Sequence, residues 1–258
     1  ARLAEAGGRL LNGRAPRAVG ISCGGPLSSA RGVILSPPNL PGWDEVPACD
    51  YFAQALGAPC FLQNDAKAFA LAEWRFGAGR GFEKVIFITF GTGLGAGLIL
   101  GGSLYEGTCD MAGEVGHVRM AEGGPLGYGK AGSLEGFCSG GGLFNLSKLM
   151  TGRGLTAREL CAAARAGDAE AAAVIRESAR YLGLGLSMLI DLLNPQRIVI
   201  GSIFARAEDL FRPEVEKIIA REALPLSRQA CRVVPAQLGE AIGDVAALCV
   251  AINGQEKG

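Results

Sequence analysis

Two carboxylates and the only histidine of the chain are side chains that could bind a polar ligand together. Glu114 and His117 stand three residues apart in "GEVGH", and Glu135 follows in "GSLEG" among closely spaced glycines. A carboxylate accepts hydrogen bonds from two neighbouring hydroxyls, so this set suits a sugar. The alternative is that the histidine is an ordinary core or surface residue. One histidine without clustered cysteines cannot build a closed zinc site.

A third carboxylate, Asp65, stands where an apolar run changes into a helical pattern. Asn64 and Asp65 follow "PCFLQ" and precede "AKAFALAEWRF". A carboxylate between a strand and a helix lies at the carboxyl edge of an α/β sheet, where such proteins bind ligands. The alternative is that Asp65 only caps the helix, which is the role we expect of Asp50 before "YFAQALG".

The glycine-rich stretch "VIFITFGTGLGAGLIL" is the third candidate for a binding function. Gly91, Gly93 and Ala96 match the loose dinucleotide pattern GxGxxA, but that site needs a helix directly after the glycines. Here a hairpin follows instead. A hairpin whose Thr92 hydroxyl and successive backbone N–H groups face a concavity can still hold phosphates. The alternative is a turn without a ligand. The sequence contains no GxxxxGK[ST] loop, which excludes a P-loop NTPase.

The elements that position these residues follow an α/β pattern. Strands alternate with helices up to residue 79, an antiparallel meander runs from 84 to 107, and residues 140–190 are mainly helical. Further strands are expected in "RIVIGS" and "RVVPA", and the other expected helices cover 1–13, 49–57, 64–79, 213–224 and 239–253. We find no internal repeat of solenoid period.

Composition points to a small-molecule partner. The chain has 258 residues with 25 basic and 25 acidic side chains, so no long-range field favours nucleic acid or an anionic membrane. Its longest apolar runs, "VIFI" and "LGLSMLI", are too short to span a bilayer. Eight cysteines without a CxxC pair are typical of reduced thiols, and we therefore expect a cytoplasmic protein.

Taken together, the motifs resemble the ROK family of bacterial sugar kinases and related repressors. The resemblance runs from about residue 18 to 250 and rests on "GISCGGPL", "PPNLPGW", "QNDAKAFALAEWRFGAG", "ITFGTGLGAGLILGGSLYEG", "AGEVGH", "GSLEG" and "RIVIGS". It implies an α/β fold of the two-lobed, actin-like ATPase (ribonuclease H-like) type. We expect residues 1–66 with 240–258 to form the small lobe and 67–239 the large lobe.

The resemblance also implies roles for individual residues. It implies ATP and Mg²⁺, with Asp65 as the general base that accepts the proton of the attacking sugar hydroxyl. The sugar would be held by Asn39, Asn64, Glu114, His117 and Glu135. The ATP phosphates would lie near Gly91, Thr92, Gly93 and Gly95, and adenosine near Gly201. Family members are expected to form homodimers.

The sequence departs from the family pattern in two places. Many members carry a zinc motif, CxCGxxGCxE, whose cysteine positions here hold Leu126, Tyr128 and Ser133. We therefore expect no zinc, with packing in place of the metal and Tyr128 as a candidate to fill the loop. The family's N-terminal DxGGT-type phosphate loop is absent from these residues. We expect the natural protein to extend beyond this sequence and to include it.

The favoured function is ATP-dependent phosphorylation of a hexose, glucose or a close relative, at its primary hydroxyl. The first alternative is a non-catalytic, sugar-sensing ROK protein or the effector domain of a repressor, although no helix-turn-helix or basic patch is present in the sequence. A kinase-derived binding or assembly protein is a third possibility, because strand edges without the hairpin could pair with another chain. The sequence does not select among the hexoses.

Overall fold

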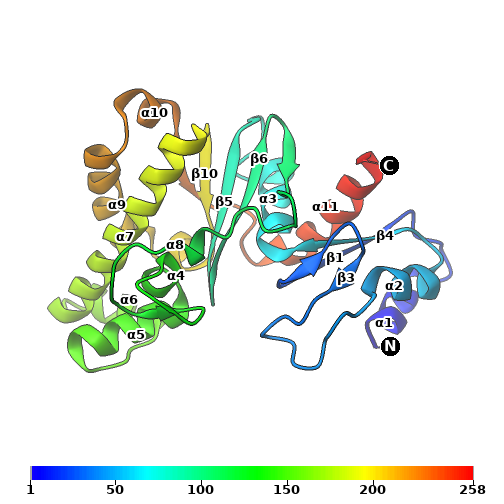
Figure 1. Cartoon of the computed structure of the whole chain (residues 1–258), viewed down its shortest axis with the longest axis horizontal. Helices are drawn as coiled ribbons and strands as arrows, with labels where there is room; N and C mark the ends of the chain where they lie inside the picture. Colours follow the sequence, from blue (N-terminus) through cyan, green and yellow to red (C-terminus); the bar gives the residue numbers. More distant parts are fainter. Residues whose placement is uncertain (1, 258) are drawn as a thin grey trace.

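A five-stranded sheet lies at the centre of the molecule in the computed structural model, which describes residues 2–257 (Figure 1). Its strand order is β11-β10-β5-β6-β7. Strands β5 (Val85–Phe90), β10 (Arg197–Ile200) and β11 (Arg232–Pro235) are parallel, whereas β6 (Leu94–Leu100) and β7 (Ser103–Tyr105) continue from β5 as antiparallel neighbours. The predicted meander is therefore confirmed.

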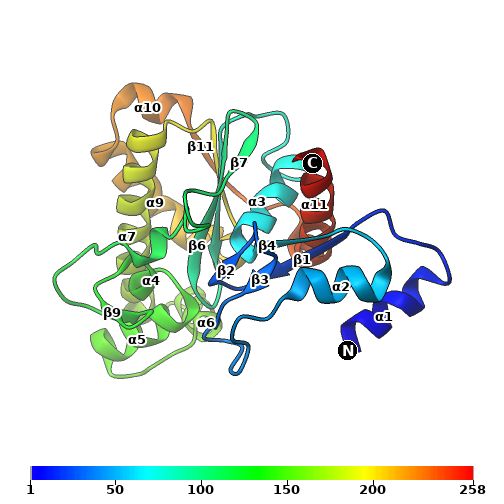
Figure 2. The same ribbon diagram turned by 45° about the vertical axis from the view of Figure 1, so that its right-hand side comes forward.

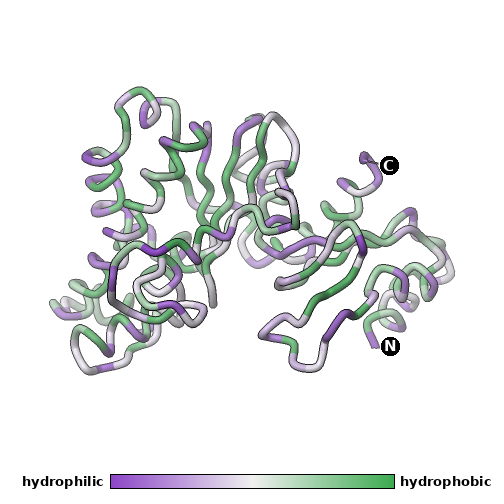
Figure 3. Tube along the Cα trace, viewed as in Figure 1, coloured by the Kyte–Doolittle hydropathy of each residue, from purple (hydrophilic) through white to green (hydrophobic). Residues whose placement is uncertain are grey.

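Strand β5 is buried on both faces because its side chains alternate between two cores. Ile86, Ile88 and Phe90 belong to the cluster formed with the helices after residue 133, and Val85 and Phe87 belong to the cluster on the opposite face. A strand covered on both faces needs an unbroken apolar run, as in "VIFITF". In Figure 3 the central strands are mostly hydrophobic.

The helices divide between the two faces of this sheet. Helix α3 (Asp65–Phe76) and helix α11 (Ile242–Lys257) pack on one face. On the other side lie the helices α4 (Leu134–Phe137), α5 (Gly140–Thr151), α6 (Ala157–Arg165), α7 (Ala169–Leu193), α8 (Ser202–Arg206) and α9 (Glu208–Glu222), and α10 (Pro225–Ala230) packs on α7 and α9.

A second, two-stranded sheet joins β1 (Val19–Cys23) to β4 (Cys60–Asn64) in parallel. Helix α11 packs against this sheet as well as against α3, and both helices lie between the two sheets (Figures 1 and 2). The remaining elements are α1 (Arg2–Leu11), α2 (Ala48–Leu56), the β2–β3 pair (Leu27–Ser28, Val33–Ile34), the β8–β9 pair (Leu126–Gly127, Lys130–Ala131), η1 (Val115–His117) and η2 (Gly239–Ala241). The lobe boundaries at 66/67 and 239/240 stay a prediction.

Several predicted boundaries change. Helix α2 begins at Ala48, after Pro47 as its N-cap, so the prediction that Asp50 caps it is wrong. Helix α9 begins at Glu208 and includes Pro213, which the sequence analysis placed at its start. Residue 1 of the expected first helix lies outside the described residues. Within residues 2–257 no helix combines the length and apolarity needed to cross a membrane.

Candidate active site

A cleft of about 850 Å³ opens between the β4–α3 junction and the segments that follow β5 and β7. Nearly all residues predicted to bind sugar or phosphate line it: Asn39, Asn64, Asp65, Gly91, Thr92, Gly93, Gly95, Glu114, His117 and Glu135. Gly201 does not line the cleft, but its neighbour Ser202 does. The fold therefore brings predicted residues from five separate stretches of sequence to one cavity.

Asp65 is the first residue of α3, and its neighbour Asn64 is the cap. The side-chain oxygen of Asn64 accepts hydrogen bonds from the N–H groups of Ala66 and Lys67, at 3.0 and 3.4 Å. One Asp65 oxygen accepts from Ala66 N–H at 2.8 Å. Burial raises the pKa of Asp65 above its usual range, and these hydrogen bonds oppose the shift. The alternative in which Asp65 serves only as the cap is therefore wrong, because Asn64 fills that position.

The "GEVGH" segment lies directly along β6, and two glycines make this possible. The carbonyl of Gly113 accepts a hydrogen bond from Ala96 N–H at 2.8 Å. A Cβ at Gly113 would stand 2.0 Å from the Ala96 carbonyl oxygen, and one at Gly116 would stand 2.1 Å from that of Leu94. Any larger residue would lift the segment off the strand. The close approach fixes Glu114 and His117 beside the glycine turn.

Glu135 joins the same wall of the cleft from α4. Ser133 caps this helix by accepting a hydrogen bond from Gly136 N–H at 3.1 Å. One carboxylate oxygen of Glu135, Oε2, accepts from Leu94 N–H at 3.0 Å. Glu135 is thus attached to the first residue of β6, immediately after the glycine turn.

The loop that holds Leu126, Tyr128 and Ser133, the positions compared with zinc-motif cysteines above, is held by polar contacts. The Ser133 hydroxyl lies 3.2 and 3.1 Å from the carbonyl oxygens of Gly127 and Lys130, and Lys130 Nζ donates to the carbonyl of His117 at 2.7 Å. Tyr128 is 65% exposed and meets the His117 ring edge-on, with centroids 6.1 Å apart. The prediction that Tyr128 fills the loop is therefore wrong, because its ring lies over the surface of the cleft.

The glycine turn itself packs on the start of α5. Gly140 N–H donates to the carbonyl of Gly91 at 2.7 Å, and Ser139 caps α5 through Gly142 N–H. Thr92 is exposed to the cleft. Within the turn, Gly91 N–H donates to the Gly93 carbonyl at 3.1 Å, so the Thr92 hydroxyl is the polar group of the turn that is exposed for an anionic group such as phosphate. Gly201 is the N-cap of α8 and lies against the Phe87 ring, and its contact with adenosine stays a prediction.

Lys67 is a site residue that the sequence analysis missed. Its side chain is only 1% exposed, and its Nζ donates to the carbonyl oxygens of Asp110 and, at 3.4 Å, of Glu106. Burial lowers the pKa of Lys67. Loss of hydration raises the pKa of Glu114, and the Lys67 ammonium opposes that shift. Lys67 therefore supports the segment that carries Glu114.

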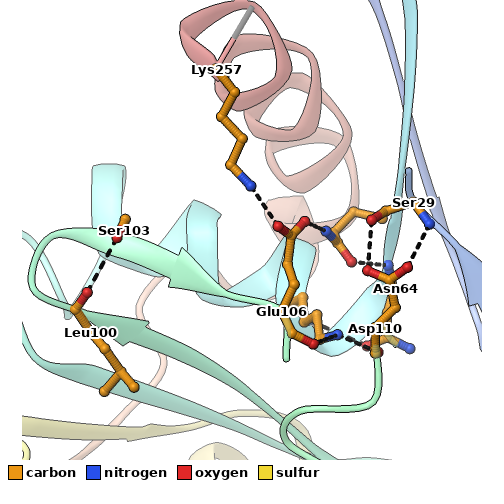
Figure 4. Close-up of polar contacts among 9 residues, drawn as sticks. Ser29, Asn64, Leu100, Ser103, Glu106, Asp110 and Lys257 are labelled. Carbon is orange, nitrogen blue, oxygen red and sulfur yellow. Dashed lines mark hydrogen bonds and ion pairs between the residues drawn. The ribbon is translucent and has the colours of Figure 1, made fainter. Parts of the chain in front are cut away.

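Side chains from distant parts of the chain fasten the same segment (Figure 4). Glu106 accepts hydrogen bonds from Gln63 Nε2 at 2.8 Å and from Lys257 Nζ at 2.6 Å. Asp110 accepts from the backbone N–H and the hydroxyl of Ser29, at 2.9 and 2.6 Å. The only signal in the sequence was one lysine within the alanine-rich apolar pattern "AKAFALA".

No group of three or more His, Cys, Asp or Glu side chains in residues 2–257 is arranged to hold a metal ion. The positions of the zinc-motif cysteines hold leucine, tyrosine and serine. That the protein works without zinc stays a prediction.

Comparison with known proteins defines the class of this chain. The model of the ROK family matches residues 6–253, and the chain belongs to that family. A glucokinase of Streptomyces coelicolor is 33% identical over 249 residues, covering 89% of this chain and 78% of the relative. The DNA-binding transcriptional repressor Mlc of Escherichia coli is 31% identical over 229 residues, covering 85% of this chain and 56% of the repressor.

Solved structures confirm the predicted fold. A ROK hexokinase from Thermus thermophilus has a TM-score of 0.89 and 33% identity, covering 100% of this chain and 86% of that chain. A ROK family glucokinase from Streptomyces griseus, solved with glucose and AMPPNP, has a TM-score of 0.81 and 32% identity. The match covers 98% of this chain and 88% of that chain. The protein therefore has the actin-like ATPase fold of the sugar kinases.

Proposed function

We propose that the protein transfers the γ-phosphoryl group of ATP to the primary hydroxyl of a hexose, glucose or a close relative. The observation that carries this proposal is the position of Asp65, a partly buried carboxylate on the same cleft as the sugar-type residues and the glycine turn. The glucokinase and hexokinase relatives support it.

Asp65 acts as the general base. As the bond from the sugar oxygen to phosphorus forms and the bond from phosphorus to the ADP oxygen breaks, Asp65 accepts the hydroxyl proton. Burial raises the pKa of Asp65, which makes the ionised carboxylate a stronger base near neutral pH. Such a base contributes about 10²- to 10⁴-fold in rate.

The sugar hydroxyls are bound by Asn39, Asn64, Glu114, His117 and Glu135. Because the cap of α3 occupies the side-chain oxygen of Asn64, its NH₂ group is the part that donates to the sugar. Glu114 and Glu135 accept hydrogen bonds from sugar hydroxyls. Closure of a small lobe, residues 1–66 with 240–258, onto residues 67–239 would exclude water that competes for the phosphoryl group.

The glycine turn holds the phosphates of ATP, and Gly201 lies toward adenosine. Bound Mg²⁺ would neutralise phosphate charge and would itself be held mainly by phosphate and water oxygens. The oxygen atoms of Asp65 and Thr92 on the cleft wall are of the kind that Mg²⁺ accepts. We expect the protein to act as a homodimer in the cytoplasm.

The second candidate function is a sugar sensor without catalysis. It is favoured by the similarity to Mlc, whose name is that of a transcriptional repressor. Such a protein would keep the sugar-binding wall of the cleft and would not turn over ATP.

Coupled ADP release with Mg-ATP across a panel of hexoses distinguishes the two functions, with Asp65→Asn alongside the natural full-length protein. Hexose-dependent turnover that the substitution abolishes is the expected result. No turnover, with hexose binding intact by calorimetry, would replace the kinase with the sensor.

A further inference from the structure

One carboxylate touches both halves of the proposed active site. Glu135 is proposed to bind sugar through its carboxylate, and Oε2 of that carboxylate already accepts the Leu94 N–H at 3.0 Å. Leu94 directly follows the turn proposed to hold the ATP phosphates. The Leu94 N–H uses one of the lone-pair sites of Oε2, which leaves further acceptor sites on the carboxylate for sugar hydroxyls.

The segment that carries Glu135 packs on the turn at a second point. Gly140 N–H donates to the carbonyl of Gly91 at 2.7 Å, only five residues after Glu135. Both contacts involve backbone atoms of the turn, at its first residue and just beyond its last. Residues 133–142 and the turn at 91–94 therefore meet through two hydrogen bonds.

The space around the carboxylate is tight on the side of the turn. A Cβ placed on Gly93 would stand 2.8 Å from Oε2 of Glu135, closer than real Cβ contacts. A Cβ on Gly91 would meet only ordinary contacts, with the hydroxyls of Ser202 and Thr89 at 3.5 Å. Two glycines of one turn thus differ in whether a methyl group would reach Glu135.

We propose that Glu135 couples the two subsites, so that hexose and nucleotide bind synergistically. A hexose that fixes the Glu135 carboxylate also fixes the turn through Leu94, and the nucleotide then binds a turn that is already ordered. By linkage, the nucleotide must tighten hexose binding by the same factor. This inference rests on the proposed function, because it needs a hexose at Glu135 and a nucleotide at the turn.

Calorimetry on the natural full-length protein tests the coupling directly. The affinity for glucose, or for the hexose that the activity panel selects, is measured alone and with saturating Mg-AMPPNP, and the affinity for Mg-AMPPNP is measured with and without the hexose. We expect each ligand to increase the affinity of the protein for the other by at least about fivefold, and the two factors to be equal. A factor of one in either direction overturns the inference while leaving the kinase proposal intact.

Gly93→Ala and Gly141→Ala form a matched pair for the second test. Gly93→Ala displaces the Glu135 carboxylate, so hexose affinity measured without any nucleotide should fall about 5- to 10-fold, and the coupling should fall toward one. A Cβ on Gly141 meets nothing within 4 Å, so the hexose affinity of Gly141→Ala without nucleotide should stay within twofold of the wild type.

The outcomes separate cleanly. The role of Glu135 would be refuted if Gly93→Ala bound the hexose as tightly as the wild type does. It would also be refuted if both variants lost hexose affinity by the same factor. A wild-type protein that binds neither a hexose nor Mg-AMPPNP would refute the proposed function and this inference with it. If Gly93→Ala does not fold, the coupling factor is measured in Glu135→Ala instead, and a factor that stays at the wild-type value would refute the role of Glu135.

Discussion

Helix α3 carries two acidic side chains in contrasting settings. Glu73 is completely buried and accepts three backbone N–H bonds, from Ala78 at 2.7 Å and from Gln237 and Leu238 at 2.9 Å each. Asp65, two turns earlier, faces the cleft, and its carboxylate accepts the N–H of Ala66. Burial raises the pKa of Asp65.

The difference separates a structural carboxylate from a chemical one. Glu73 fixes the chain just before α11 to the end of α3, and its hydrogen bonds offset the cost of burial. At Asp65 the hydrogen bonds offset only part of the free-energy cost of burying a charged carboxylate. The ionised Asp65 is therefore a stronger proton acceptor, and it stabilises the fold less. Such a trade of stability for chemistry is common at active sites.

The largest effect is expected from Asp65→Asn on catalysis. Asparagine keeps the shape of the side chain and cannot accept the hydroxyl proton, so kcat for the preferred hexose should fall about 10²- to 10⁴-fold. Hexose affinity by calorimetry should change little. A variant with more than a tenth of the wild-type kcat would show that Asp65 is not the base.

Glu73→Ala should affect the fold and spare the chemistry. It leaves three backbone N–H groups without their acceptor, at about 1–3 kcal/mol for each one that stays unsatisfied, so the free energy of unfolding should fall by at least about 3 kcal/mol if all three stay unsatisfied. Urea denaturation measures this loss, and kcat of the folded fraction should remain within twofold. A loss below about 1 kcal/mol would mean that water replaces the carboxylate.

The pH dependence of stability should report the raised pKa of Asp65. The folded pKa of Asp65 is raised, so its stabilising protonation is complete below the unfolded value of about 3.8 and is lost as pH rises through the folded value. Asparagine stays neutral throughout. Asp65→Asn should therefore become more stable than the wild type as pH increases from 4.5 to 8 in urea denaturation. If the free energy of unfolding of Asp65→Asn instead fell relative to that of the wild type as the pH increases, the raised pKa of Asp65 would be contradicted.

The sequence predicted the elements and cleft residues whose signals are local. The apolar run in "VIFITF", the strand-to-helix change at Asn64 and the spacing in "GEVGH" each lie within a few residues, and local geometry follows from them. The resemblance to a family placed these motifs on one cleft. The structure confirms that Glu114, His117 and Glu135 share its wall.

The buried charges of α3 could not be predicted in the same way. The partners of Lys67 are carbonyl oxygens of residues 106 and 110, and two of the three partners of Glu73 lie more than 160 residues away. An alanine-rich helix with scattered charges normally places those charges in water. Only tertiary packing, which no local pattern records, shows that both side chains lie inside the protein.

The smallest effect is expected for a carboxylate that neither holds the fold together, as Glu73 does, nor faces the cleft, as Asp65 does. Asp50 lies exposed in the first turn of α2, whose cap, Pro47, makes no side-chain hydrogen bond. Only the helix dipole favours its charge, so Asp50→Ala should change the free energy of unfolding by at most about 0.5 kcal/mol at physiological salt. Asn64→Ala, which removes the actual cap of α3, should cost about 0.5–2 kcal/mol. If urea denaturation gave equal losses for the two, position at the start of a helix, rather than the bonded partner, would determine the value of a polar side chain there.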